Sequence, residues 1–146
     1  MVSNPIELAL FASRLDAVCE EMGVVLRRAA VSPNIRDRLD FSCAVFDADG
    51  LLCAQAAHIP VHLGSMAYAM AGIVAAVDWA EGDMLVLNDP FLGGTHLPDV
   101  TLVAPLFVAG ELIGFLAFLY NKSDIGGFMA GYMALWILLD VYLMEI

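Results

Sequence analysis

The residues best suited to chemistry lie in one loop, residues 88–99, which holds His96 and the carboxylates of Asp89 and Asp99. The loop follows an apolar run, residues 84–87, that is typical of a buried strand. Turn residues and ligand-type side chains after a strand are how a rigid scaffold presents a binding or reactive site. The imidazole of His96 and the carboxylate of Asp99 suit Zn, Mn or Fe, and such an ion would activate water or polarise a carbonyl group.

The spacing of His96 and Asp99 leaves a second interpretation open. Side chains three positions apart on a straight strand face opposite ways, but Leu-Pro at residues 97–98 favours a turn that brings both to one point. A hydrogen-bonded His–Asp pair that holds no metal would have the same spacing. Likewise, Gly93 and Gly94 either let a ligand approach the backbone closely or serve the turn alone.

Three further groups of polar residues stand at the ends of predicted elements. His58 and His62 flank a proline-containing segment, and they are candidates for metal ligands, for acid–base groups or for histidines bonded to the backbone. Asp40 stands where a strand is predicted to begin, and taken alone it is typical of a surface carboxylate. Asp124 begins another glycine-containing turn at the end of a strand.

Two helices are predicted around these residues. Apolar residues recur at helical spacing from residue 6 to about residue 31, which predicts a long amphipathic helix with Ser3 or Asn4 as its N-cap. An alanine-rich second helix is predicted over residues 66–79, with Ser65 as its cap. The alanines would allow other elements to pack closely against it.

Two β-hairpins are predicted from apolar runs that flank turn residues. The first joins residues 41–46 to residues 51–55 around an Asp-Gly turn. The second joins residues 100–107 to residues 112–119, and its almost continuous apolar character predicts burial on both faces. Together with the helices, the hairpins predict an α+β fold with one mixed or antiparallel sheet.

The composition indicates an incomplete piece of a larger fold. Hydrophobic residues make up 61% of the 146 residues, whereas about 45–50% is usual for a soluble domain. The net charge of −11 argues against nucleic acid as a partner, because binding to phosphates requires lysine and arginine. Four of the six basic residues cluster over residues 27–38, where they either face an anion or pair with acidic neighbours.

The cysteines and the C-terminal residues bear on localisation. An odd number of cysteines, without a C-x-x-C pair or a preceding leader segment, favours a cytoplasmic protein with reduced thiols. Residues 128–146 are apolar and approach the ~20 residues that span a bilayer. A charged residue near the middle, Asp140, opposes insertion, so a membrane partner is not expected.

Five segments, taken in order, carry a resemblance to a known family. They are RRAAVSPNI (27–35), DFSCA (40–44), FDADG (46–50), AQAAHIPVHLGSM (54–66) and NDPFLGGTHLPD (88–99). These segments resemble the N-terminal part of the hydantoinase B/oxoprolinase family, which includes 5-oxoprolinase, caprolactamase and acetone carboxylase subunits. The resemblance divides the chain into residues 1–133, which match the family domain, and residues 134–146, a divergent apolar tail.

The resemblance implies an enzymatic function. Family B subunits are longer than this chain and act with a hydantoinase A-type ATP-binding subunit that uses ATP to activate the substrate. This implies a fragment of a cyclic amide hydrolase of the hydantoinase or 5-oxoprolinase type, which opens the ring of an activated intermediate with a divalent metal, and a hetero-oligomer. Two alternatives stay open: a ketone carboxylase subunit of the same family, and a truncated, non-catalytic interaction fragment.

The resemblance also implies roles for single residues. It places the metal ligands at Asp40, His96 and Asp99, with a fourth at a position where the family has histidine and this chain has Asn121. His58 and His62 are expected to be catalytic groups on the substrate side. An amide is a weaker ligand than imidazole, and Lys122 adds a positive charge nearby, so the expected metal affinity is reduced. The substrate and backbone loop positions implied are Asp89, Gly93, Gly94 and Asp124.

Overall fold

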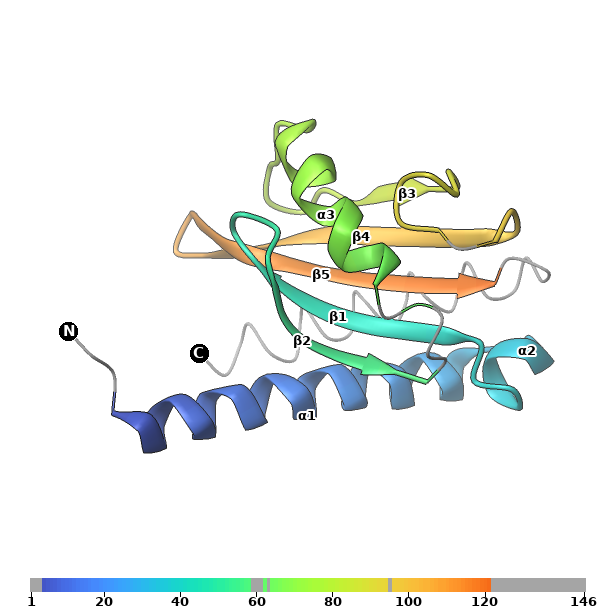
Figure 1. Ribbon diagram of the computed structural model, residues 1–146, viewed down its shortest axis with the longest axis horizontal. Coiled ribbons are helices and arrows are strands. Elements are labelled where there is room, and N and C mark those ends of the chain that lie inside the picture. The colour runs from blue at the N-terminus through green and yellow to red at the C-terminus, as the bar shows by residue number, and fades with distance from the viewer. Residues whose placement is uncertain (1–3, 59–61, 63, 95, 122–146) are drawn as a thin grey trace.

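A five-stranded antiparallel sheet forms the centre of the fold, as the computed structural model of the chain shows (Figure 1). The structure describes residues 4–58, 62, 64–94 and 96–121. The elements in chain order are α1 (Pro5–Ala29), α2 (Pro33–Arg36), β1 (Phe41–Asp47), β2 (Leu52–Ala57), α3 (Ser65–Ala75), β3 (Leu85–Leu87), β4 (Asp99–Val108) and β5 (Glu111–Asn121). The strand order β2-β1-β5-β4-β3 confirms the α+β prediction and makes the sheet antiparallel throughout.

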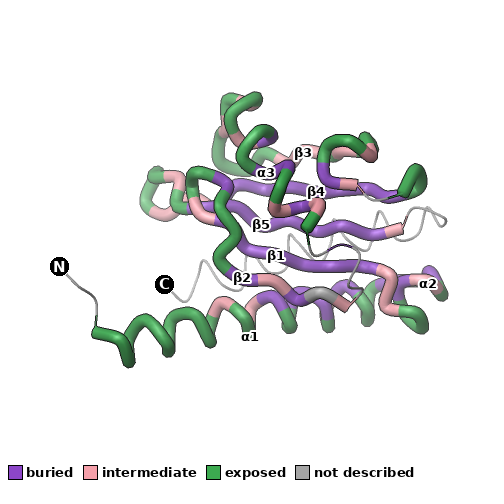
Figure 2. The backbone as a smooth tube through the Cα atoms, viewed as in Figure 1, coloured by how far each residue is buried: buried purple, intermediate pink, exposed green. Residues whose placement is uncertain are grey.

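Successive side chains of a strand point to opposite sides of the sheet, and in this fold both sides are covered. One face packs on α1, and the other packs on α3 (Figures 1 and 2). The core on the α1 side includes Cys19, Met22, Leu26, Phe41, Cys43, Leu102, Phe118 and Tyr120. The core on the α3 side includes Ala44, Phe46, Met66, Met70, Val103, Phe115 and Leu119. This double burial explains the nearly continuous apolar runs of β4 and β5.

The long N-terminal helix is confirmed, and it is followed by a short helix that was not predicted. The Asn4 side chain accepts a hydrogen bond from the Ile6 amide at 3.1 Å, so Asn4 is the N-cap. The sequence predicted only that the long helix would end near residue 31, and α2 forms a single turn directly after that point, from Pro33 to Arg36. The Arg36 guanidinium pairs there with the Asp37 carboxylate at 3.0 Å, as the local-pairing interpretation expected.

The second helix differs from its prediction at both ends. Gly64 is the N-cap without a side-chain cap bond, and Ser65 is the first helical residue. The helix ends at Ala75 instead of residue 79. The Trp79 indole N–H donates to the carbonyl oxygen of Val74 at 3.1 Å, and its ring packs edge-on against Phe115 with centroids 5.0 Å apart. The chain therefore leaves the helix early and folds Trp79 back onto the sheet.

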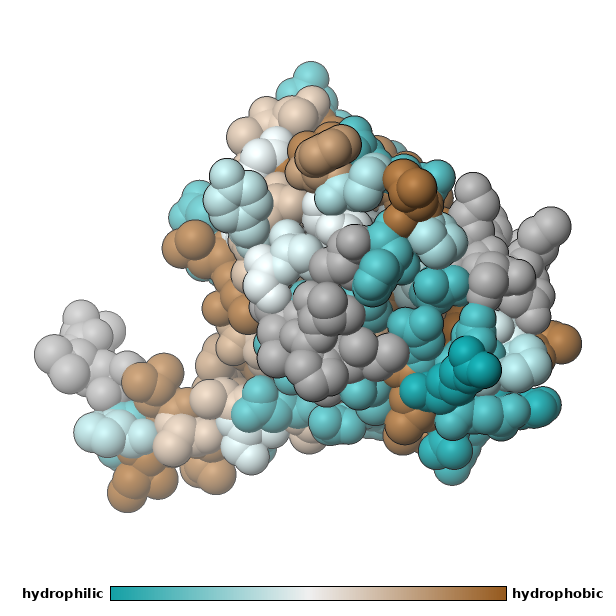
Figure 3. Space-filling model, turned by 45° about the vertical axis from the view of Figure 1, so that its right-hand side comes forward, coloured by the Kyte–Doolittle hydropathy of each residue, from teal (hydrophilic) through white to brown (hydrophobic). Residues whose placement is uncertain are grey.

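The first turns of α1 extend beyond the sheet and carry exposed apolar side chains (Figures 2 and 3). Ile6, Leu8, Leu10 and Phe11 are between 57% and 68% exposed. Farther along α1, Leu15 and Val18 pack against the core. An exposed apolar surface is what the composition predicted, since the chain holds more apolar residues than its own core can bury.

The apolar C-terminal residues lie outside the described residues. The possible membrane span at residues 128–146, the turn that begins at Asp124 and the boundary after residue 133 all fall there. Within the part of the chain that is described, no helix combines the length and the apolar character needed to cross a bilayer.

Two glycine substitutions test how closely β5 approaches β1. A Cβ atom at Gly114 would overlap the carbonyl oxygen of Phe46 on the paired strand. We expect Gly114→Ala to lower the free energy of unfolding by about 1–3 kcal/mol, because the backbone must shift. Gly72→Ala in α3 is the control, since its Cβ would meet no atom within 4 Å and alanine favours a helix by about 0.5–1 kcal/mol. Chemical denaturation that finds equal effects would contradict the close approach.

Candidate functional site

The candidate site lies at the end of the sheet where β1 and β4 begin and β5 ends. Asp40 directly precedes β1, Asp99 is the first residue of β4, and Asn121 is the last residue of β5. Asp99 pairs with Asn121 across the strands, and the Asn121 amide donates to the carbonyl oxygen of Asp40 at 3.3 Å. The antiparallel arrangement therefore brings together three residues that are far apart in the sequence.

A tight turn joins His96 to Asp99. The Asp99 carboxylate accepts a hydrogen bond from the His96 amide at 2.8 Å, and the His96 ring nitrogen Nδ1 lies 3.4 Å from the same oxygen. The Asp99 side chain is fully buried, whereas that of His96 is 55% exposed. The turn thus brings imidazole and carboxylate to one point, as the Leu-Pro sequence between them suggested.

The Asn88 side chain holds this turn against the end of β3. Its amide nitrogen Nδ2 donates to the carbonyl oxygen of Leu97 at 3.2 Å and to that of Asp99 at 2.6 Å. One side chain therefore satisfies two backbone acceptors, one in the turn and one at the first residue of β4. This fixes the direction in which the loop returns to β4.

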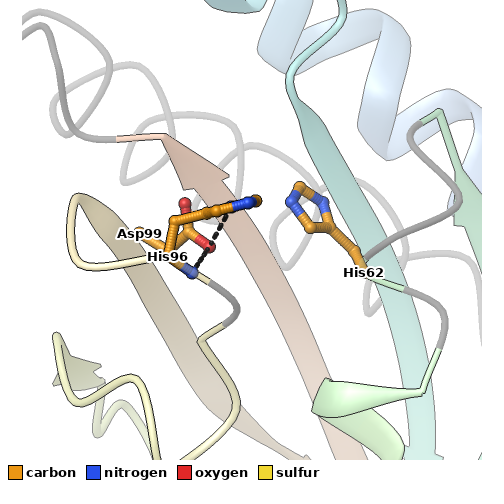
Figure 4. Close-up of side chains that lie close together, drawn as sticks. All are labelled: His62, His96 and Asp99. Carbon is orange, nitrogen blue, oxygen red and sulfur yellow. Dashed lines mark hydrogen bonds and ion pairs between the residues drawn. The ribbon is translucent and has the colours of Figure 1, made fainter.

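His62 approaches the turn from the opposite side (Figure 4). Its side chain is buried, and its nitrogen Nε2 lies 4.0 Å from a carboxylate oxygen of Asp40. One ligand atom from each of His62, His96 and Asp99 lies within 4.8 Å of the others. The sequence left His62 open as a metal ligand, an acid–base group or a histidine bonded to the backbone, and the family resemblance implied a catalytic group; the structure brings its side chain next to His96 and Asp99.

The donor atoms of this cluster fit a divalent metal. Bonds of about 2.1 Å in a tetrahedral site would place ligand atoms roughly 3.4 Å apart, so small side-chain rotations would close the cluster around an ion. Nε2 of His62 is buried and has no hydrogen-bond partner among the described residues. A buried polar atom of this kind calls for an explanation such as an ion or a water molecule. Two imidazoles with carboxylates suit Zn, Mn or Fe.

The electrostatics keep His62 in the form that binds metals. Burial lowers the pKa of His62, and nearby His96 lowers it further, while the carboxylates of Asp99 and Asp40 oppose the shift. Since burial is the largest cause, the lowered pKa of His62 favours the neutral imidazole. A neutral imidazole has a lone pair available for coordination.

His58, the other predicted catalytic histidine, lies on the opposite face of the sheet. Its ring packs on Phe41 with centroids 4.5 Å apart, and its Nε2 lies 3.9 Å from a carboxylate oxygen of Glu20 in α1. Phe41 belongs to the core on the α1 side, whereas the next residue, Ser42, faces His62. The structure therefore does not bring His58 and His62 into one site.

The predicted loop residues shape the turn that precedes His96. The Asp89 carboxylate accepts the Phe91 amide at 2.8 Å, so it stabilises the loop locally. Gly93 has a φ of +97°, and a Cβ there would lie 3.5 Å from that of Ala69 in α3. A Cβ at Gly94 would lie 3.1 Å from Pro90. The positive φ of Gly93 and the close approach of Gly94 to Pro90 explain why glycine occupies each position, whether or not a ligand approaches them.

Comparisons with known proteins agree with the resemblance. The model of the hydantoinase B/oxoprolinase family matches residues 4–135. The 5-oxoprolinase of Saccharomyces cerevisiae is 45% identical over 133 residues, which are 88% of this chain and 10% of that protein. The ATP-dependent caprolactamase from Pseudomonas jessenii has a similar structure, with a TM-score of 0.70 and 29% identity over 85% of this chain and 22% of that one.

An acetone carboxylase in its nucleotide-free structure shares the fold, with a TM-score of 0.73 over 82% of this chain and 16% of that one. At 24% identity this likeness concerns the fold alone. The chain thus spans 10% to 22% of the length of the oxoprolinase and caprolactamase that it matches. Since the family model covers residues 4–135 of 146, the chain belongs to the hydantoinase B/oxoprolinase family.

Proposed function

We propose that the chain forms part of a B subunit of an ATP-dependent cyclic amide hydrolase of the hydantoinase or 5-oxoprolinase type. The observation that carries the proposal is the cluster of His62, His96 and Asp99, with Asp40 beside it, in a chain of this family. The partner is a hydantoinase A-type ATP-binding subunit, which activates the substrate with ATP. The two chains would form a hetero-oligomer.

Asp40, His96 and Asp99 would hold a divalent Zn, Mn or Fe ion, with Asn121 at the edge of the site. Such an ion supplies a Lewis acid for a carbonyl oxygen, or a bound water of lowered pKa. Asp99 is held in place by the His96 amide, so its carboxylate keeps a fixed direction. Asp40 is 24% exposed, which supports a position on the side from which a substrate would approach.

Hydrolysis is favoured over ketone carboxylation by the relatives. The 5-oxoprolinase and caprolactamase names both denote enzymes that act on cyclic amides, and these relatives are 45% and 29% identical to the chain. The acetone carboxylase is 24% identical and supports the fold alone. A cyclic amide is therefore the proposed substrate class.

Removal of one imidazole tests the metal site. We expect the chain to bind one equivalent of Zn²⁺ or Mn²⁺, and His96→Ala to weaken binding by at least about 100-fold, since the loss of a ligand exceeds the effect of outer-shell changes. His58→Ala is the matched control, because His58 lies on the opposite face and should leave binding unchanged. Isothermal titration with each ion measures this. Equal affinity for the chain and His96→Ala would reject the site.

A second substitution tests whether Asn121 limits the affinity. Asn121→His places imidazole at the end of β5, opposite Asp99, where the family resemblance has histidine. We expect tighter metal binding by roughly tenfold or more, because imidazole is the better ligand for Zn or Fe. Asn121→Gln, which keeps the amide, should not strengthen binding. No gain with histidine would show that residue 121 does not reach the ion, and a gain with glutamine would show that the length of the side chain, and not the imidazole, limits binding.

Activity requires the partner subunit. We expect the chain, combined with an A-type subunit, to support ring opening of a cyclic amide only when ATP and a divalent ion are present. His96→Ala should lower this rate by at least about 100-fold. ATP-dependent fixation of bicarbonate onto a ketone, without ring opening, would favour the carboxylase alternative. If a metal-loaded, partner-bound chain supported neither ring opening nor bicarbonate fixation, the result would contradict an enzymatic role.

A further inference from the structure

Ser42 is the polar member of a strand whose other buried residues are apolar. It lies in β1 between Phe41 and Cys43, is 2% exposed, and points away from the α1 side of the sheet. Its hydroxyl oxygen lies 3.0 Å from Nδ1 of His62. A buried hydroxyl needs a hydrogen-bond partner, and here the partner is the imidazole that faces His96 and Asp99.

The contact with Ser42 bears on which ring nitrogen of His62 carries the proton and which carries the lone pair. In a neutral imidazole one ring nitrogen carries the proton and the other carries a lone pair. If Nδ1–H donates to the Ser42 hydroxyl, the lone pair lies on Nε2. Nε2 is buried, has no hydrogen-bond partner in the described part of the chain and lies 4.0 Å from the Asp40 carboxylate.

His62 also supplies what residue 121 lacks. With Asn121 in place of an imidazole, Asp40, His96 and Asp99 would give the ion a single nitrogen ligand. Nε2 of His62 lies 4.0 Å from a carboxylate oxygen of Asp40, and His62 belongs to the same cluster as His96 and Asp99. A ligand from the segment before α3 would therefore complete a set of two imidazoles and two carboxylates.

We propose that His62 is a metal ligand through Nε2, and that Ser42 is the positioning residue that orients the ring by accepting the Nδ1 proton. This proposal rests on the metal site of the proposed function and deepens it. It changes the role of His62 from an acid–base group to a ligand. Outer-shell partners of this kind orient a ligating histidine and fix its tautomer.

Zn²⁺ titration followed by ¹⁵N–¹H NMR of the histidine rings tests the proposal directly. In the Zn²⁺-saturated chain we expect Nε2 of His62 to show the shift of a metal-bound nitrogen, and Nδ1 to carry the proton. We expect His62→Gln to weaken Zn²⁺ binding by at least about 100-fold, and Ser42→Ala by about 10–100-fold. Ser42→Thr, which keeps the hydroxyl, should retain most of the affinity. Circular dichroism of each variant checks that it is folded.

The outcomes separate the proposed roles of His62 and Ser42 from the proposed metal site on which they rest. If the chain binds Zn²⁺ and His96→Ala does not, but the His62 ring shifts are unchanged by Zn²⁺, His62 is not a ligand and the further proposal fails alone. Zn²⁺-bound Nε2 with unchanged affinity in Ser42→Ala would overturn the role of Ser42. No difference in Zn²⁺ binding between the chain and His96→Ala would overturn both proposals.

Discussion

The candidate site depends on the register of β5 between β1 and β4. This register places the last residue of β5, Asn121, opposite Asp99 and beside the backbone of Asp40. Because side chains alternate between the faces of a sheet, a slip of one residue would turn the residues of one strand to the opposite side. Gly114 contributes to this register, since its missing side chain allows β5 to approach Phe46 closely.

Burial on both faces of the sheet restricts where polar chemistry can be placed. Along β1, β4 and β5 the two apolar cores occupy nearly every position, and a buried polar group there must find a partner. The strand ends are different, because loops contribute amide groups and solvent is near. Ser42 and Asp99 are buried polar residues close to this end, and both have partners in the loops that meet there.

Much of the fold could be predicted because its signals are local. The Asn4 cap, the amphipathic spacing of α1 and the Asp-Gly turn between β1 and β2 each depend on neighbours in the sequence. The early end of α3 could not be predicted, because Trp79 turns back to contact Phe115 in a distant strand. The insertion of β5 between β1 and β4 is likewise a property of the whole sheet.

The candidate site likewise combines a local feature that the sequence predicted with long-range features that it did not. The turn that joins His96 to Asp99 was predictable, since Leu-Pro between them is a local signal. The position of His62 was not, because two histidines four residues apart give no indication that they lie on opposite faces of a sheet. Ser42 carries a weak signal, because it is a hydroxyl residue in an otherwise apolar strand directly after Asp40 and Phe41.

The chain's own hydrogen bonds hold the loop of the candidate site, although Nε2 of His62 is buried without a hydrogen-bond partner among the described residues. The fully buried Asp99 carboxylate accepts the His96 amide, and the Asp99 carbonyl accepts the Asn88 side chain at 2.6 Å. An unsatisfied buried group would cost about 1–3 kcal/mol, and more for a charged one. The loop is thus shaped by its own hydrogen bonds, unlike a small zinc domain that is unfolded without its metal. An ion bound here would stabilise the folded chain by mass action, by about 2.7 kcal/mol at a hundredfold excess over Kd, in addition to any chemistry that it supplies.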